Sequence, residues 1–353
     1  MRQHCHFLYP GALATRTGGT LYDRAIVDGL RALGWQVQAQ SLGDGFPWPA
    51  ADVGEAARTQ VGALPDGSLV VVDGLAFGVL DALAQAHAQR LRWVALVHHP
   101  LALETGLDAV QRRALHTSEA AALATVRGII VTSARTVRDL AGYGVAPSAV
   151  RVVLPGTARA PLAAGSRAGA PLQLLCVASL TPRKGHRVLL QALAGLTDLD
   201  WHLQCAGGAH FDPSCAADIR AAIETLGLSP RVSLLGEVAH EADLARLYDG
   251  ADAFVLPSFH EGYGMALAEA LARGLPVIST DAGAIPDTVP ADAGLLVPPG
   301  DVAALQAALR RLLTDAAWRG QLQAGARRAR DTLPDWTDAS ARFADALLHF
   351  AAP

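Results

Sequence analysis

The feature that most constrains the fold of this chain is a regular alternation of short apolar runs with longer amphipathic stretches along 353 residues. In the stretch 21–33, for example, Leu21, Ala25, Val27, Leu30 and Leu33 recur near one face of a helix. Apolar runs separated by helices pair as a parallel sheet that helices cover on both sides. The pattern predicts an α/β fold.

The alternation occurs in two successive blocks. The segment 156–171 between them is rich in Gly, Ala and Pro and has no periodicity, as is typical of a linker. We predict an N-terminal Rossmann-like domain (1–160), a linker (161–171), a C-terminal Rossmann-like domain (172–335) and a C-terminal helix (336–353) that packs back on the first domain. Predicted strands are 4–9, 36–42, 69–73, 92–97, 128–132 and 150–154, then 172–178, 201–206, 232–235, 253–257, 276–280 and 295–297. Predicted helices include 187–196, 216–226, 242–248, 265–273, 302–313 and 336–350.

Two doubly wound domains joined in this way face each other across a cleft, and such sheets bind ligands at the carboxyl ends of their strands.

Composition excludes several classes of protein. Hydrophobic residues make up 51% of the chain, which is enough for sizeable cores, yet no apolar run reaches the roughly 18–20 residues of a transmembrane helix. The N-terminus enters a strand before a signal-peptide core develops, so we expect a cytoplasmic protein. A net charge of −4 and the absence of an Arg-rich run argue against nucleic-acid binding. The four cysteines form no CxxC pair and are expected to be buried, reduced thiols.

Lys184 is the only lysine among 29 basic residues, the other 28 being arginine. It lies in a segment, 177–186, that is predicted to leave a strand and enter a helix. A compact ammonium suits a phosphate site as a point charge. The neighbouring Arg183 either assists it or forms a surface salt bridge, and the sequence leaves both interpretations open.

A second block, 257–279, again runs from a strand end through a glycine-bearing loop into a helix that begins near Gly264. Gly262 and Gly264 allow backbone N–H groups to turn towards an anion, which the helix dipole also favours. Glu261 and Glu269 are eight residues apart, so they can contact two separate parts of an elongated ligand. Glu269 could instead be a solvated helix residue, but its neighbours are all apolar.

These segments belong to an ordered series of motifs. The series contains Thr17-Gly-Gly-Thr20, a histidine after the fourth strand, Val152-Val-Leu-Pro-Gly156, the Arg-Lys-Gly loop, Leu235-Gly-Glu-Val, the stretch 248–258, the Glu-x7-Glu block, Gly283-Ala-Ile-Pro286 and the stretch 294–300. In this order and over nearly its whole length, the chain resembles glycosyltransferase family 4, whose members have the GT-B architecture and transfer sugars from sugar nucleotides with retention of configuration.

The resemblance implies roles for individual residues. Lys184 would bind the donor diphosphate, Glu261 the sugar hydroxyls and Glu269 the ribose. Backbone amides of Gly262, Tyr263, Gly264 and Met265 would surround the phosphates, and Gly18 and Gly19 would lie near the donor phosphate and the acceptor. His98 would contact the transferred sugar, with His99 as the fallback; a structural histidine at a strand end is the alternative for either.

One position departs from the family. Ala178-Ser179-Leu180 stands where the family usually carries Gly-Arg-Leu, and that arginine normally pairs with the lysine on the diphosphate. Ser179 can donate a hydrogen bond but carries no charge. Arg183 can substitute only if its loop turns it inward.

The resulting hypothesis is a hexosyltransferase that moves a sugar from a nucleotide-diphosphate sugar to the hydroxyl of a glycan, lipid-linked sugar or small molecule. We expect no cofactor and no metal, because Asp198 and Asp200 or Asp249 and Asp252 do not form a set of free oxygen ligands. A homo-oligomer is compatible with the sequence. One alternative is an inactive partner subunit or sugar-nucleotide binder, which the uncharged Ser179 favours. A second alternative is a glycoside phosphorylase. A dehydrogenase is disfavoured because no Gly-x-Gly-x-x-Gly motif follows the first strand.

Overall fold

The structure is a computed structural model, and it describes residues 3–351. The chain forms two compact units, one of Met1–Gly156 with Pro334–Pro353 and the other of Thr157–Leu333. Each unit contains one six-stranded sheet. The units therefore divide at 156/157 and 333/334, whereas the sequence analysis placed the domain limits at 160, 172 and 336.

The first unit is built on a parallel sheet with the strand order β2-β1-β3-β4-β5-β6. The order reverses between β1 and β3, which makes this pair the switch point where doubly wound sheets bind ligands. The strands are β1 (His4–Tyr9), β2 (Gln36–Ser41), β3 (Leu69–Asp73), β4 (Arg92–Val97), β5 (Gly128–Val131) and β6 (Val150–Val152).

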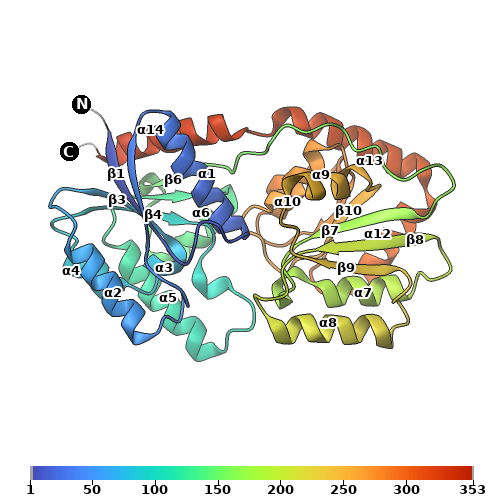
Figure 1. The fold of residues 1–353 in the computed structure, drawn as a ribbon, viewed down its shortest axis with the longest axis horizontal. Coiled ribbons are helices and arrows are strands. Elements are labelled where there is room, and N and C mark those ends of the chain that lie inside the picture. Colours follow the sequence, from blue (N-terminus) through green and yellow to red (C-terminus); the bar gives the residue numbers. More distant parts are fainter. Residues whose placement is uncertain (1–2, 352–353) are drawn as a thin grey trace. The chain divides into compact units, whose positions relative to one another are not determined.

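Helices cover both faces of this sheet (Figure 1). Helix α1 begins after Thr17, whose side chain accepts from the backbone N–H of Thr20 in a capping box, and it buries Tyr22, Ile26 and Leu30. It packs against the C-terminal helix α14. The helices are α1 (Gly18–Ala32), α2 (Ala51–Gly62), α3 (Gly74–Phe77), α4 (Asp81–Ala86), α5 (Ala109–Leu123), α6 (Ala134–Asp139) and α14 (Trp336–Ala351), with 3₁₀ turns η1 (Leu101–Leu103), η2 (Leu140–Tyr143) and η3 (Pro147–Ala149).

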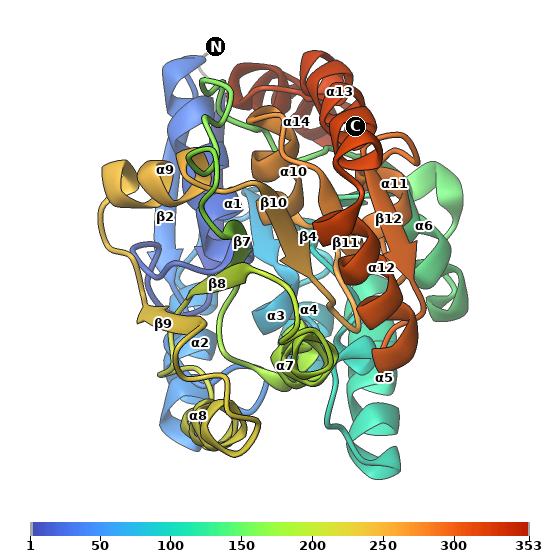
Figure 2. The same cartoon turned by 90° about the vertical axis from the view of Figure 1, so that its right-hand side faces the viewer.

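The second unit repeats the plan with the strand order β12-β11-β10-β7-β8-β9, so its switch point lies between β7 and β10. Helices α7 and α8 lie on one face of this sheet, and α9 and α10 lie on the other (Figures 1 and 2). The strands are β7 (Leu172–Val177), β8 (Trp201–Ala206), β9 (Val232–Gly236), β10 (Ala253–Leu256), β11 (Val277–Thr280) and β12 (Gly294–Val297). The helices are α7 (His186–Ala194), α8 (Pro213–Thr225), α9 (Glu241–Asp249), α10 (Met265–Ala272), α11 (Ile285–Thr288), α12 (Val302–Thr314) and α13 (Ala316–Ala329), with η4 (Pro182–Lys184) and η5 (Arg330–Thr332).

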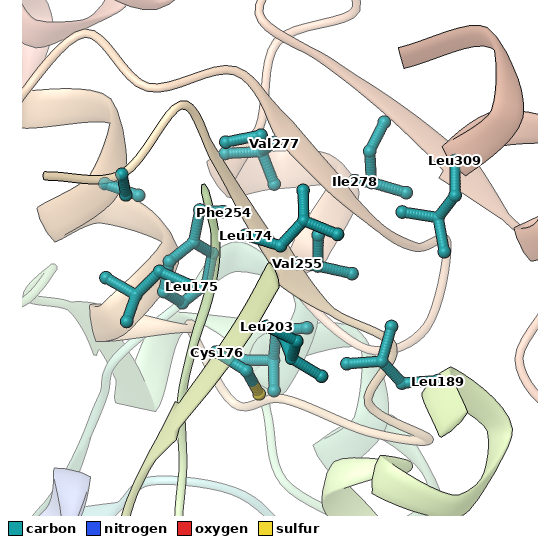
Figure 3. Packing of buried hydrophobic residues seen from close by; sticks show 14 of the residues in the cluster. Leu174, Leu175, Cys176, Leu189, Leu203, Phe254, Val255, Val277, Ile278 and Leu309 are labelled. Carbon is teal, nitrogen blue, oxygen red and sulfur yellow. The ribbon is translucent and has the colours of Figure 1, made fainter. Parts of the chain in front are cut away.

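The strands of the second unit supply a continuous apolar core (Figure 3). Leu174 and Leu175 are adjacent in β7, and both are buried because helices cover both faces of the sheet. Phe254 of β10 and Val277 of β11 are paired in register and are equally buried. This core fixes the strand ends from which the loops of the candidate site emerge.

The Gly/Ala/Pro-rich segment that was expected to be a linker is tied to the second unit. The carboxylate of Asp249 accepts from the backbone N–H of Ala164 (3.2 Å), and that of Asp252 accepts from Ser166 (3.0 Å) and Gln173 (2.8 Å). Both carboxylates therefore accept hydrogen bonds from backbone N–H groups of this segment, which need a partner when they are removed from water.

All twelve predicted strands are present to within two residues at either end. The sequence analysis named no helix at α2, α5 or α13. In α2 only Ala57 and Val61 are buried, so large apolar residues do not recur there at helical spacing. No helix within residues 3–351 is long and apolar enough to cross a membrane.

Candidate functional site

Lys184 and Glu261, which are 77 residues apart in sequence, meet at the β7–β10 switch point. The Nζ of Lys184 donates to Oε1 of Glu261 at 2.7 Å. Lys184 ends the short turn η4 after β7, and Glu261 lies in the loop after β10. The ammonium has three N–H donors, of which Glu261 takes one. The structure thus brings together two of the residues that the sequence analysis singled out.

Glycines allow the two loops to approach closely. Gly185 has φ +71°, and a Cβ there would lie 2.1 Å from the carbonyl oxygen of Pro257. The backbone N–H of Phe259 donates to the carbonyl of Arg183 (2.8 Å). A Cβ on Gly283 would lie 2.3 Å from the carbonyl oxygen of Glu261, which accounts for the glycine of the Gly-Ala-Ile-Pro motif.

The Glu261 carboxylate is held by several donors. Ser258, which is fully buried, donates to Oε1 at 2.6 Å, and Arg183 Nη1 lies 3.6 Å from Oε2. Burial raises the pKa of Glu261, but the charges of Lys184 and Arg183 and the hydrogen bonds outweigh it and hold the pKa at about 2. Burial in turn lowers the pKa of Lys184, and Glu261 opposes that shift. The pair is therefore an ionised, largely buried ion pair.

Arg183 turns towards this site. Its Nη1 donates to the carbonyl of His260 at 2.8 Å, and its side chain is only 20% exposed. Arg183 therefore does not form a surface salt bridge, which was one of the two interpretations that the sequence left open. Ser179 lies just beyond β7 and is half-buried, so the position of the family arginine remains uncharged.

The N-terminus of α10 presents backbone N–H groups beside this ion pair. Gly264, with φ +92°, precedes Met265, and no side chain caps the helix. An uncapped helix N-terminus attracts anions through its N–H groups and its dipole. Tyr263, which precedes Gly264, is fixed because the hydroxyl of Thr288 donates to its carbonyl oxygen (2.6 Å). The loop 262–265 thus has the geometry expected for a phosphate cradle.

Glu269 is one further turn along α10, and its carboxylate is also fixed. Tyr248, fully buried at the end of α9, donates to Oε2 at 2.8 Å. Burial raises the pKa of Glu269, and the hydrogen bond from Tyr248 and the charge of Arg273 oppose the rise. Arg273 also lies over the Tyr248 ring, 4.4 Å from its centroid. Glu269 is a partly buried, positioned acceptor and not a solvated helix residue.

A cavity of about 370 Å³ lies between the end of β9 and the start of α9. The sequence analysis quoted the Leu-Gly-Glu-Val motif at this place but assigned it no role. The lining residues of the cavity are Leu235, Glu237, Val238, Ala239, Asp243, Arg246 and Leu247.

In the first unit, His98 immediately follows β4 and lies near the start of α1. A Cβ on Gly19 would be 3.5 Å from two ring atoms of His98, so the Gly18-Gly19 turn and the histidine are close neighbours. Nε2 of His98 is 3.2 Å from Oδ1 of Asp23 and 3.2 Å from Oδ2 of Asp73. His99 instead faces Glu104 at 3.4 Å.

The sequence analysis missed both of these aspartates. Asp23 lies on the buried face of α1, where a polar residue among Tyr22, Ile26 and Val27 was a detectable signal. Asp73 ends the apolar strand β3. Burial and the charge of Asp73 raise the pKa of Asp23 to about 7. Burial lowers the pKa of His98, but its hydrogen bonds and charge interactions with the two aspartates raise it to about 10.

Within residues 3–351, two groups of side chains have possible metal-ligand atoms within 4.8 Å of one another: Asp23, Asp73 and His98, and Cys176, His186 and Cys205. In the second group, Cys176 Sγ lies 3.7 Å from Nε2 of His186, a hydrogen-bonding distance for sulfur. We assign no metal ligand to either group. All four cysteines are free thiols, and Cys215 is only half-buried.

Known structures share this two-unit architecture. Sucrose-phosphate synthase from Thermosynechococcus elongatus superposes with a TM-score of 0.81 at 24% identity, covering 98% of both chains. HepE of Anabaena, in complex with UDP and glucose, gives 0.76 at 16% identity, covering 98% of this chain and 100% of that one. The two parallel-sheet, Rossmann-like units therefore match GT-B glycosyltransferase structures, which confirms the predicted fold class.

Sequence comparisons show that much of the second unit is similar to glycosyltransferases. Residues 171–315 match the family model described as glycosyl transferases group 1. The MMP alpha-(1->4)-mannosyltransferase of Mycolicibacterium hassiacum is 29% identical over 76% of this chain and 67% of its own length. O-antigen chain mannosyltransferase B of Escherichia coli is 34% identical over 41% of this chain and 38% of its own length. The matches thus span between about a third and two thirds of these relatives, and residues 171–315 are similar to a group 1 glycosyltransferase domain.

Proposed function

We propose that the chain is a glycosyltransferase that moves a hexose from a nucleotide-diphosphate sugar to an acceptor hydroxyl, with retention of configuration and without a metal. The observation that carries this proposal is the buried Lys184–Glu261 pair beside the uncapped N-terminus of α10. An ammonium and a helix N-terminus at one switch point suit a diphosphate. Relatives named as mannosyltransferases and a HepE structure with UDP-glucose support a sugar nucleotide as the donor.

In this proposal, the second unit binds the donor. Lys184 and the backbone N–H groups of 262–265 neutralise the diphosphate, an electrostatic role that grows as the leaving group gains charge. Glu261 accepts from the sugar hydroxyls and Glu269 from the ribose. The cavity lined by Leu235 and Val238 takes the base.

The first unit supplies His98, Gly18 and Gly19 to the transferred sugar and the acceptor. The new C1–O bond forms on the face from which the C1–O(phosphate) bond breaks, and the departing phosphate takes the proton of the acceptor hydroxyl. The low pKa of Glu261 supports this route, because a carboxylate held by Lys184 and Arg183 is a weak nucleophile.

Metal independence is supported by how three aspartates that the sequence analysis considered as ligands are used. Asp198 pairs with Arg310 (2.9 Å), and Asp249 and Asp252 accept from backbone N–H groups. We expect transfer to be unchanged in excess EDTA. Activity that disappears with EDTA and returns with Mg²⁺ or Mn²⁺ would contradict this part of the proposal.

The direct test is a thermal-shift screen of UDP-, GDP-, ADP- and TDP-sugars, followed by assays of nucleoside-diphosphate release with glycan, lipid-linked and small-molecule acceptors. A donor that binds only the folded state raises its apparent stability. We expect Lys184→Ala to abolish donor binding in calorimetry, whereas the control Arg310→Ala, which breaks an exposed ion pair in the same unit, binds normally. Absence of hydrolysis and transfer with every donor and acceptor would oppose the proposal.

A second candidate function is sugar-nucleotide binding without turnover. The uncharged Ser179 favours it, because one cation fewer faces the diphosphate. Tight binding of a sugar nucleotide with no release of nucleoside diphosphate would support this candidate. Introducing Ser179→Arg should then raise donor affinity.

A further inference from the structure

Asp23 has a buried carboxylate for which the proposed reaction has no use. Its side chain lies on α1 and is fully buried. Oδ1 faces Nε2 of His98 at 3.2 Å, whereas Oδ2 is buried and has no hydrogen-bond partner within residues 3–351. A buried carboxylate is costly unless it is paired, so its pairing with His98 calls for a functional explanation.

A second carboxylate faces the same nitrogen. Oδ2 of Asp73 is also 3.2 Å from Nε2, and Asp73 is itself fixed because its Oδ1 accepts from the backbone N–H of Leu75 at 2.7 Å. One N–H therefore serves two buried carboxylates. When both carboxylates are ionised, a neutral imidazole would leave the group with a net charge of −2 and an imidazolium with a net charge of −1, so the charged ring is favoured.

The surroundings of His98 fix the ring from other sides as well. Tyr22 packs edge-on against it, with ring centroids 5.3 Å apart, and Thr132 donates to the carbonyl oxygen of His98 (3.2 Å). The side chain is 20% exposed, and its contacts with Asp23 and Asp73 both involve Nε2. Gly19 lies against the Nε2–Cδ2 edge of the ring, and Nδ1 is the ring nitrogen that the two aspartates leave to a ligand.

We propose that Asp23 and Asp73 are positioning residues that clamp Nε2–H of His98, so that Nδ1–H faces the ligand as a hydrogen-bond donor to an oxygen of the transferred sugar. This inference rests on the proposed function for its ligand, but not for the state of the ring. A ring that holds both protons cannot accept the acceptor's proton, which excludes His98 as the general base. Asp23 thereby becomes part of the site without touching the substrate.

The state of the ring can be measured without any activity. Long-range ¹H–¹⁵N spectra of ¹⁵N-histidine-labelled protein at pH 8 report whether each ring is neutral or charged, and His98→Gln identifies its signals. We expect both nitrogens of His98 to be protonated in the wild type. In Asp23→Asn we expect the ring to lose its second proton at a lower pH. A neutral His98 in the wild type at pH 8 would overturn the proposal, and so would Mn²⁺ binding that depends on Asp23.

Kinetics supply a separate readout once a donor is known. We expect Asp23→Asn to lower kcat by about tenfold, the scale on which partners behind a functional histidine act, with little change in KM for the donor. The control Asp28→Asn lies on the same helix in an exposed ion pair with Arg31 and should behave as the wild type. Equal kcat in all three proteins would overturn the positioning role. If the chain transfers no sugar, the proposed function is refuted. The spectra then still decide whether Asp23 and Asp73 hold His98 in its charged form.

Discussion

Replacing Lys184 with methionine should cost the second unit stability as well as donor binding. Methionine keeps an unbranched apolar stem but removes the ammonium that lies 2.7 Å from Oε1 of Glu261. The Glu261 side chain is only 8% exposed, so solvent cannot replace the lost cation. Removing one partner of a buried pair leaves the other charge uncompensated.

The size of the effect follows from the pKa of Glu261. Burial alone would raise this pKa above 4.5, yet Lys184, Arg183 and the hydrogen bonds bring it to about 2. A pKa difference of one corresponds to about 1.4 kcal/mol, so the surroundings of Glu261 favour its ionised carboxylate by about 3 kcal/mol at neutral pH. Lys184 is the largest favourable contributor, so its loss should cost up to about 3 kcal/mol, or about 6–12 °C in Tm for a unit of this size. Because the folded-state pKa is depressed, this stability is present above pH 4.5 and is lost as the pH falls towards 2.

The assay is a double-mutant cycle of Lys184→Met, Glu261→Gln and the double variant. Hydrogen exchange in urea, followed by mass spectrometry on peptides of residues 172–333, isolates the second unit, since two units need not unfold together. In the double variant neither partner is charged, so we expect it to recover part of the loss. Arg310→Ala serves as the control and should cost no more than about 1 kcal/mol, because its ion pair with Asp198 is exposed.

The reasoning would be refuted if the two single losses simply add in the double variant, because no coupling would then join Lys184 and Glu261. A loss in Lys184→Met that persists unchanged at pH 3 would also contradict it. At that pH the coupling should already be weakening.

Further variants test other parts of both units. Gly185→Ala should destabilise the second unit by several kcal/mol and abolish donor binding, because a Cβ would lie 2.1 Å from the carbonyl oxygen of Pro257 at a φ of +71°; calorimetry and thermal unfolding check this. Tyr248→Phe should raise KM for the donor several-fold with kcat unchanged, because Glu269 loses a donor at 2.8 Å; an unaltered KM would argue against a role of Glu269 in binding. Phe350→Ala should destabilise the first unit by about 3–5 kcal/mol, since this buried side chain anchors α14, and chemical unfolding would measure the change.

The locations of the strands and of the donor loops were predictable from the sequence because each depends on local patterns. A strand covered on both faces must be a continuous apolar run, and loops such as 182–185 and 257–264 combine glycines with charged residues at strand ends. Helices α2 and α13 were missed because their apolar stripes are weak. The attachment of the predicted linker segment to Asp249 and Asp252 could not be predicted, because it is a long-range contact.

The sequence by itself determined two doubly wound sheets and placed Lys184 and Glu261 on loops that end at carboxyl edges, because periodicity and composition act within short windows. Only the tertiary structure decided which side chains meet. Asp23, Asp73 and His98 come from α1, from the end of β3 and from the residue after β4, and nothing in their spacing joins them. The strand order brings those three elements to one switch point, and packing around the buried carboxylates then sets the orientation and charge of His98. Likewise, the direction of Arg183 depends on the backbone carbonyl of His260, which a distant loop supplies.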